Sequence, residues 1–204
     1  MCLFTWAEIG DHVVPQDVTQ VIIDRSVSII QRGAFFQRTK LVSVETHEGI
    51  ESVEMNAFNS CCRLRKINLI GVREVERAAF HSCSALTDVE FGDKLETIGD
   101  DAFNFCISLQ KLTMPSVRII EAGAFAECAQ LTEAEFGGNL ETIQQQAFYT
   151  CPSLRRIVIP LKDDMIPEHV VQHRCSQFDR CPNLTTVDLV GGIHNTVSCL
   201  LLAP

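Results

Sequence analysis

The sequence predicts a single α/β solenoid of about eight stacked coils, each of 22 or 23 residues. Three regularities predict it: a leucine that returns at this spacing, an Ala-Phe pair in the second half of each coil, and a cysteine three residues after the phenylalanine. The leading leucines are Leu41, Leu64, Leu86, Leu109, Leu131, Leu154 and Leu184. A unit this short cannot bury its own apolar face, so the copies must stack and share one core.

Each coil is predicted to contain one strand and one helical turn. In the coil that begins at Leu86, apolar and polar residues alternate as far as Phe91, which is typical of a half-buried strand. Farther along, Ile98, Ala102 and Cys106 recur at intervals of four, which predicts one face of a short helix. We therefore expect a parallel β-sheet along one face of the solenoid and short helical turns along the other.

The repeats also set the expected domain boundaries. Residues 1–17 precede the first repeat and are expected to form an N-terminal cap, with Phe4 and Trp6 covering the first coil. Residues 18–190 are expected to form the solenoid, and residues 191–204 a C-terminal cap or tail.

The repeat resembles the BspA-type leucine-rich repeat. Its frame runs Leu-x-x-Ile/Val-x-Leu/Phe and then Ile-x-x-x-Ala-Phe-x-x-Cys-x-x-Leu, and the stretches that begin at Leu109 and Ala147 match it most closely. The resemblance covers about residues 18–189 and extends to members known from bacterial surface proteins, protists and unicellular algae. It implies a leucine-rich-repeat solenoid with a binding role, and it implies no catalytic residue because the motif consists of core positions.

A longer period lies above the single repeat, because coils of 23 and 22 residues alternate. Leu86–Ser108 and Leu131–Ser153 are identical at 13 of 23 positions, which indicates that a two-coil unit was duplicated. Two residues after the leading leucines, the charge alternates in sign: Lys66, Asp88, Lys111, Glu133 and Arg156. In a parallel, in-register sheet these side chains are expected to form a ladder of opposite charges that holds the register.

A second column, two residues farther along each strand, is acidic on every second strand. Its members are Glu45, Asn68, Glu90, Thr113, Glu135, Val158 and Asp188. The strands between the glutamates carry no basic residue at this position, so we predict that the column faces a basic or polar segment of a protein partner. Ile22, Ile70 and Val158 are predicted to be the apolar centre of this partner face, since exposed charges alone contribute little.

Six of the ten cysteines share one position in the repeat. They are Cys61, Cys83, Cys106, Cys128, Cys151 and Cys181. Their place beside the Ala-Phe pair predicts small, buried hydrophobic side chains, and disulfides between neighbours would distort the stacked backbone. We therefore predict reduced thiols, with Cys62 exposed, and an intracellular, cytoplasmic location.

One coil is 30 residues long, because an insertion at about residues 162–180 interrupts the pattern. The insertion contains His169, His173 and Cys175, which together with Cys181 can supply four zinc ligands. Since Cys181 belongs to the buried cysteine position, we prefer a helical protrusion that holds no metal and makes a second contact with the partner.

Several functional classes are excluded at this level. The net charge of -9 argues against a nucleic-acid partner, because binding to phosphate needs a basic surface. No apolar run is long enough for a membrane-spanning helix, and the first residues lack the basic start of a secretory signal. No catalytic motif, metal site or cofactor-binding motif is present.

The sequence therefore predicts a non-enzymatic module for protein–protein interaction or scaffolding, which binds through its exposed sheet face. A structural subunit of a larger assembly and a surface adhesin-like protein are the alternatives. The residues name neither the partner nor the oligomeric state.

Overall fold

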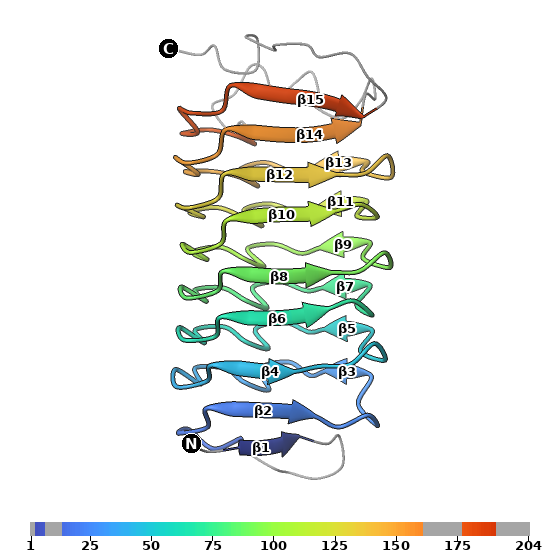
Figure 1. Ribbon diagram of the computed structural model, residues 1–204, viewed down its shortest axis with the longest axis vertical. Helices are drawn as coiled ribbons and strands as arrows, with labels where there is room; N and C mark the ends of the chain where they lie inside the picture. The colour runs from blue at the N-terminus through green and yellow to red at the C-terminus, as the bar shows by residue number, and fades with distance from the viewer. Residues whose placement is uncertain (1–2, 7–13, 161–176, 191–204) are drawn as a thin grey trace.

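The computed structural model describes residues 3–6, 14–160 and 177–190. The chain winds into a stack in which each coil lies on the one before it (Figure 1). The front face is formed by the strands β1 (Leu3–Trp6), β2 (Gln20–Ile23), β4 (Ser43–Glu45), β6 (Lys66–Leu69), β8 (Asp88–Phe91), β10 (Lys111–Met114), β12 (Glu133–Phe136), β14 (Arg156–Pro160) and β15 (Thr186–Val190). All of their pairings are parallel, in two sheets of order β1-β2-β4-β6-β8 and β10-β12-β14-β15.

A second parallel sheet of six short strands forms the back face, in the order β13-β11-β9-β7-β5-β3. Its strands are β3 (Ile29–Ile30), β5 (Ser52–Val53), β7 (Glu74–Val75), β9 (Thr97–Ile98), β11 (Ile119–Ile120) and β13 (Thr142–Ile143). The described residues therefore contain about six complete turns, rather than the eight that the leucine spacing suggested. Because hydrogen bonds join successive coils on both faces, both faces have the strand spacing of roughly 4.8 Å, and the stack in Figure 1 is straight.

The prediction of helical turns is wrong for the described residues, where tight turns follow each back strand. In one coil Asp101 and Phe105 have φ values of 54° and 61°, in the left-handed region that interrupts a helix. The backbone N–H groups also alternate in direction. Those of Phe103 and Phe105 donate to the next coil, whereas those of Asn104 and Cys106 donate within their own turn. A helix would use every N–H internally and would lose the bonds between coils.

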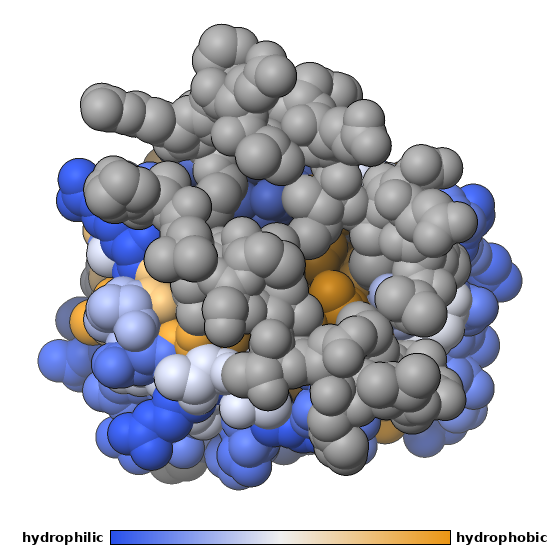
Figure 2. Space-filling view, turned by 90° about the horizontal axis from the view of Figure 1, so that it is seen from above, coloured by the Kyte–Doolittle hydropathy of each residue, from blue (hydrophilic) through white to orange (hydrophobic). Residues whose placement is uncertain are grey.

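The spacing that suggested a helix still marks the inward-facing side chains. Ile98, Ala102 and Cys106 are all buried, but they come from a strand and two turns. The leading leucines are buried as well, so the predicted coil register is confirmed. Seen along the stack, hydrophobic residues lie at the centre and hydrophilic residues at the rim (Figure 2).

A continuous column of phenylalanine rings runs through this core. Its members are Phe35, Phe58, Phe80, Phe103, Phe125, Phe148 and Phe178. Neighbouring rings stack with centroids 4.9 to 5.4 Å apart and planes within 15° of parallel. Trp6 packs edge-on against Phe35 at 5.5 Å, which places an aromatic ring beneath the first coil. One buried ring per coil explains the excess of phenylalanine.

The cysteine position has a hydrogen-bonding role as well as a packing role. Each thiol donates to the carbonyl of the phenylalanine one coil earlier, at 3.0 to 3.4 Å, as Cys83 does to Phe58. All cysteines in the described ranges are free, those at the repeat position are buried, and Cys62 is exposed, as predicted. In the first coil Arg38 replaces the cysteine, and its Nε donates to the carbonyl of Val14 at 2.8 Å.

Candidate functional site

The first column of the front face forms ion pairs between neighbouring strands. Lys66 Nζ lies 3.1 Å from Asp88 Oδ2, and Lys111 Nζ lies 2.8 Å from Glu133 Oε2. Both pairs are in register across β6–β8 and β10–β12. The hydrogen bond from Lys111 and its positive charge lower the pKa of Glu133. The predicted charge ladder is therefore present, and these side chains neutralise one another.

A second set of ion pairs lies just before the back strands. Arg73 Nη1 is 3.4 Å from Glu96 Oε1, and Arg118 Nη2 is 3.0 Å from Glu141 Oε1. In each pair the cation comes from the first coil of a two-coil unit and the carboxylate from the second coil. The duplicated unit in the sequence is thus also a unit of electrostatic pairing.

The acidic column lies on the same exposed face as the ladder. Glu45, Glu90 and Glu135 are exposed on β4, β8 and β12, which alternate with β6 and β10 along the front face. Asn68 is in register with Glu90, and its Nδ2 donates to Glu90 Oε2 at 3.1 Å. Thr113 is in register with Glu135. No ion pair is formed by the three glutamates within residues 3–6, 14–160 and 177–190.

The column differs from the prediction at its C-terminal end. Arg156 Nε donates to Asp188 Oδ2 at 2.6 Å, so Asp188 is neutralised instead of extending the acidic column. Val158 is only 8% exposed, although it lies in register between Glu135 and Asp188. A β-branched apolar side chain at this strand position packs inward more readily than it faces water.

The other two predicted apolar contacts also separate. Ile22 is half-buried on β2, whereas Ile70 is 40% exposed in the turn that follows β6. Ile70 is therefore the principal apolar side chain that this face presents to a partner.

Two exposed apolar side chains lie in the turns of one coil and were missed by sequence reasoning. Phe105 and Ile107 are 46% and 42% exposed, and the Phe105 ring lies edge-on to His81 with centroids 5.9 Å apart. The available signal was positional: Phe105 is an additional phenylalanine, two residues after the one that fills the core position of its coil.

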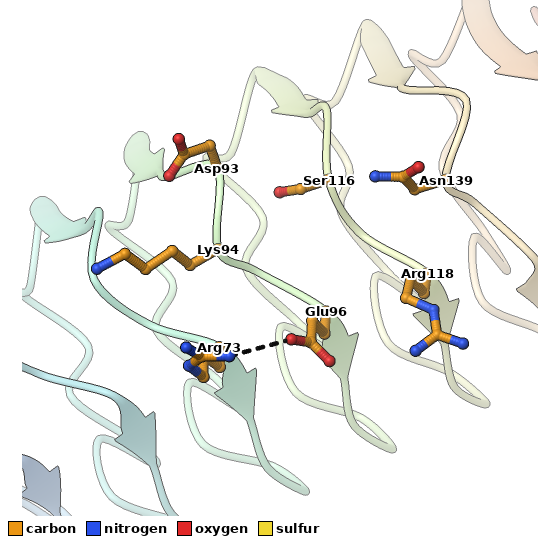
Figure 3. A pocket seen from close by; sticks show the side chains of 7 residues that line it. All are labelled: Arg73, Asp93, Lys94, Glu96, Ser116, Arg118 and Asn139. Atoms are coloured by element: carbon orange, nitrogen blue, oxygen red, sulfur yellow. Dashed lines mark hydrogen bonds and ion pairs between the residues drawn. The ribbon is translucent and has the colours of Figure 1, made fainter.

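A polar hollow of about 380 Å³ lies where the front strands lead into the back strands (Figure 3). Its lining residues are Arg73, Asp93, Lys94, Glu96, Ser116, Arg118 and Asn139. The hollow follows from the alternating coil length, because the loop at 115–118 is one residue shorter than the loops at 92–96 and 137–141. Ser116 Oγ donates to the carbonyl of Gly92 at 3.3 Å. The lining contains neither histidine nor cysteine, so it offers Ser116 no base of the usual kind.

Burial suppresses the reactivity of the thiol column. Desolvation raises the pKa of Cys61 and of Cys128 to about 12 and that of Cys83 well above the ordinary range. The described residues contain no group of three or more histidine, cysteine or acidic side chains arranged to hold a metal. The insertion residues His169, His173 and Cys175 lie outside the described ranges. Within the part of the chain that the structure describes, no helix has the length and apolar character needed to cross a membrane.

Solved structures with the same architecture are bacterial. A leucine-rich repeat protein of T. pallidum is 29% identical and has a TM-score of 0.65, over 68% of this chain and 68% of its own. A leucine-rich cell surface protein from Faecalibacterium prausnitzii is 21% identical with a TM-score of 0.56, over 87% of this chain and 61% of its own. A leucine-rich repeat protein from Eubacterium ventriosum is 20% identical with a TM-score of 0.63, over 84% of this chain and 41% of its own. The chain thus spans less than two thirds of the second and third structures.

No curated protein matches the chain. The profile of the BspA type leucine-rich repeat region matches residues 15–117 and 102–198, with six copies. These matches cover most of the sequence and include the complete coils of the structure. The resemblance to protist and algal members stays a prediction, since the solved structures above are bacterial. The chain therefore belongs to the BspA-type leucine-rich repeat family.

Proposed function

We propose that this chain is a non-enzymatic binding module whose front face holds a basic segment of a protein partner. The observation that carries the proposal is the placement of Glu45, Glu90 and Glu135 on one exposed, parallel sheet face, with uncharged Asn68 and Thr113 between them. The neighbouring column is neutralised by its own ion pairs. The three glutamates therefore dominate the charge that this face presents to a partner.

The architecture favours binding over catalysis. Hydrogen bonds between coils fix the front strands, so a partner loses little free energy to ordering of the surface. Exposed ion pairs contribute little individually and are screened by salt. We therefore propose that Ile70 supplies apolar contact, while the glutamates set the orientation and the association rate.

The experiment that tests this function is site-specific photocrosslinking in native extract. A photoreactive phenylalanine derivative replaces Thr113 on the front face, and in a control chain it replaces Gln145, which is exposed in a turn after the back strands. We expect one protein to be crosslinked through position 113 and not through position 145. Crosslinking only from position 145, or equally from both, contradicts binding through the front face.

A surface adhesin-like role is the second candidate, because one structure with this fold is described as a cell surface protein. We propose instead an intracellular location, which is supported by the free, buried thiols. Fractionation of native cells separates the two: protease treatment of intact cells should leave the chain uncut. Its cleavage under those conditions contradicts the intracellular proposal.

A further inference from the structure

The front face also has a spacing that selects a particular kind of partner segment. Resting on the function proposed above, we infer that the occupant is a polyproline II segment with lysine or arginine at every third residue. It lies along the stack, across the strands from β4 to β12 (Figure 1).

The spacing argument starts from the sheet. Neighbouring strands lie roughly 4.8 Å apart, and the glutamates occupy every second strand of the front face. Successive carboxylates are therefore roughly 9.6 Å apart along the stack. A polyproline II helix rises about 3.1 Å per residue with three residues per turn, so every third side chain points the same way at intervals of about 9.3 Å. Across both intervals the mismatch is about 0.6 Å, which a flexible lysine side chain absorbs.

Other regular segments fit this spacing less well. Side chains on one face of an extended β-strand recur at about 6.8 Å and fall out of register by roughly 3 Å at the second glutamate. An α-helix places every seventh residue on nearly one face at about 10.5 Å, which accumulates a mismatch of about 1.8 Å.

The residues between the glutamates also favour polyproline II. Asn68 and Thr113 carry an amide and a hydroxyl on the exposed face, and Asn68 uses one amide hydrogen on Glu90. A polyproline II backbone has no internal hydrogen bonds, so its carbonyls are free to accept from these side chains. The carbonyls of an α-helix are already satisfied.

Synthetic peptides test this inference on the full chain by fluorescence anisotropy at low salt. The probe is Pro-Pro-(Lys-Pro-Pro)3 with both ends blocked. An isomer of the same composition carries its three lysines in one block, and an alanine-rich helical peptide carries three lysines spaced seven residues apart. We expect the probe to bind about five-fold more tightly than either comparison peptide. Equal or tighter binding of the isomer or of the helical peptide overturns the inference, and so does an undetectable affinity for all three.

Matched variants assign the binding to the column. The double substitution Glu90→Gln and Glu135→Gln should weaken binding of the probe by about 2- to 30-fold. The control, Glu51→Gln with Asp93→Asn, removes the same charge from exposed positions outside the column and should change affinity by less than about two-fold. Equal losses in both variants overturn the inference. If the peptides fail while position 113 still crosslinks a protein, only the polyproline II inference is lost; if position 113 does not crosslink, the proposed function fails.

Discussion

Lys111 Nζ and Glu133 Oε2 lie 2.8 Å apart, in register between β10 and β12 of one two-coil unit. Across the preceding boundary, from β8 to β10, the front sheet is interrupted, and no ion pair joins Asp88 to Lys111 in the described chain. The back sheet and the phenylalanine column continue through the same boundary. The duplicated unit is therefore tied internally by charge and joined to its neighbour mainly through the core and the back face.

The ion pair gives the stability a defined pH dependence. Lys111 lowers the pKa of Glu133 in the folded chain below its ordinary value of 4.5. The pair therefore stabilises the fold at pH values above about 4.5 and loses this effect as the pH falls through the lowered pKa. In the variant Lys111→Ala, the pKa of Glu133 should return toward its ordinary value, as measured by NMR titration of the side-chain carboxyl. An unchanged pKa would mean that the pair does not form in solution.

The phenylalanine column should dominate the stability of each coil. Phe103 is fully buried and stacked between two rings, so Phe103→Ala should lower the free energy of unfolding by about 3–5 kcal/mol. Phe105→Ala is the matched control, because that ring is largely exposed, and it should cost about 0.5 kcal/mol or less. Urea denaturation followed by circular dichroism measures both. Similar losses in the two variants would refute the assignment of Phe103 to the core.

Close approach between coils makes one glycine irreplaceable. A Cβ on Gly92 would lie 1.9 Å from the carbonyl oxygen of Ile70, a backbone atom that cannot move aside without disturbing the stack. Gly92→Ala should therefore destabilise the fold by about 1–3 kcal/mol. A Cβ on Gly138 would meet nothing within 4 Å, so Gly138→Ala should be neutral or stabilising by up to about 1 kcal/mol. Thermal unfolding of both variants checks this contrast, which is lost if Gly92→Ala is as stable as the native chain.

The thiols should differ sharply in reactivity. Cys62 is exposed, whereas its neighbour Cys61 is buried and has a pKa raised to about 12. At pH 8 an alkylating reagent should therefore modify Cys62 quickly and reach Cys61 and Cys83 only after denaturation. Mass spectrometry of timed digests gives the order. A disulfide at Cys83 in natively purified protein would contradict both its burial and the reducing compartment.

Much of the fold follows from residue spacing, because the same physical requirement recurs in each coil. Leu86, Phe103 and Cys106 were placed in the core from their period alone, and all three are fully buried. Spacing could not distinguish a helix from successive tight turns, since both bring every fourth residue to one side. The decisive features were the positive φ values at Asp101 and Phe105 and the hydrogen bonds to the next coil, which involve backbone atoms that every residue carries.

The candidate face was less accessible to sequence reasoning at its ends. The alternation of Glu45, Glu90 and Glu135 follows directly from the two-coil period. The pairing of Arg156 with Asp188 crosses the long insertion, so the repeat period does not predict it. The hollow around Ser116 depends on a one-residue difference in loop length, whose consequence appears only when the coils are stacked.

The most direct test of the binding account is charge reversal in the acidic column. With the protein that is crosslinked through position 113, the double substitution Glu90→Lys and Glu135→Lys should weaken affinity by about ten-fold or more at low salt, and by much less at high salt. Reversal of the paired Glu96 and Glu141, next to the back strands, should leave affinity nearly unchanged. Isothermal titration calorimetry at two salt concentrations measures both variants. If the column variant binds as tightly as the native chain while removal of residues 200–202 abolishes binding, the front-face account is contradicted.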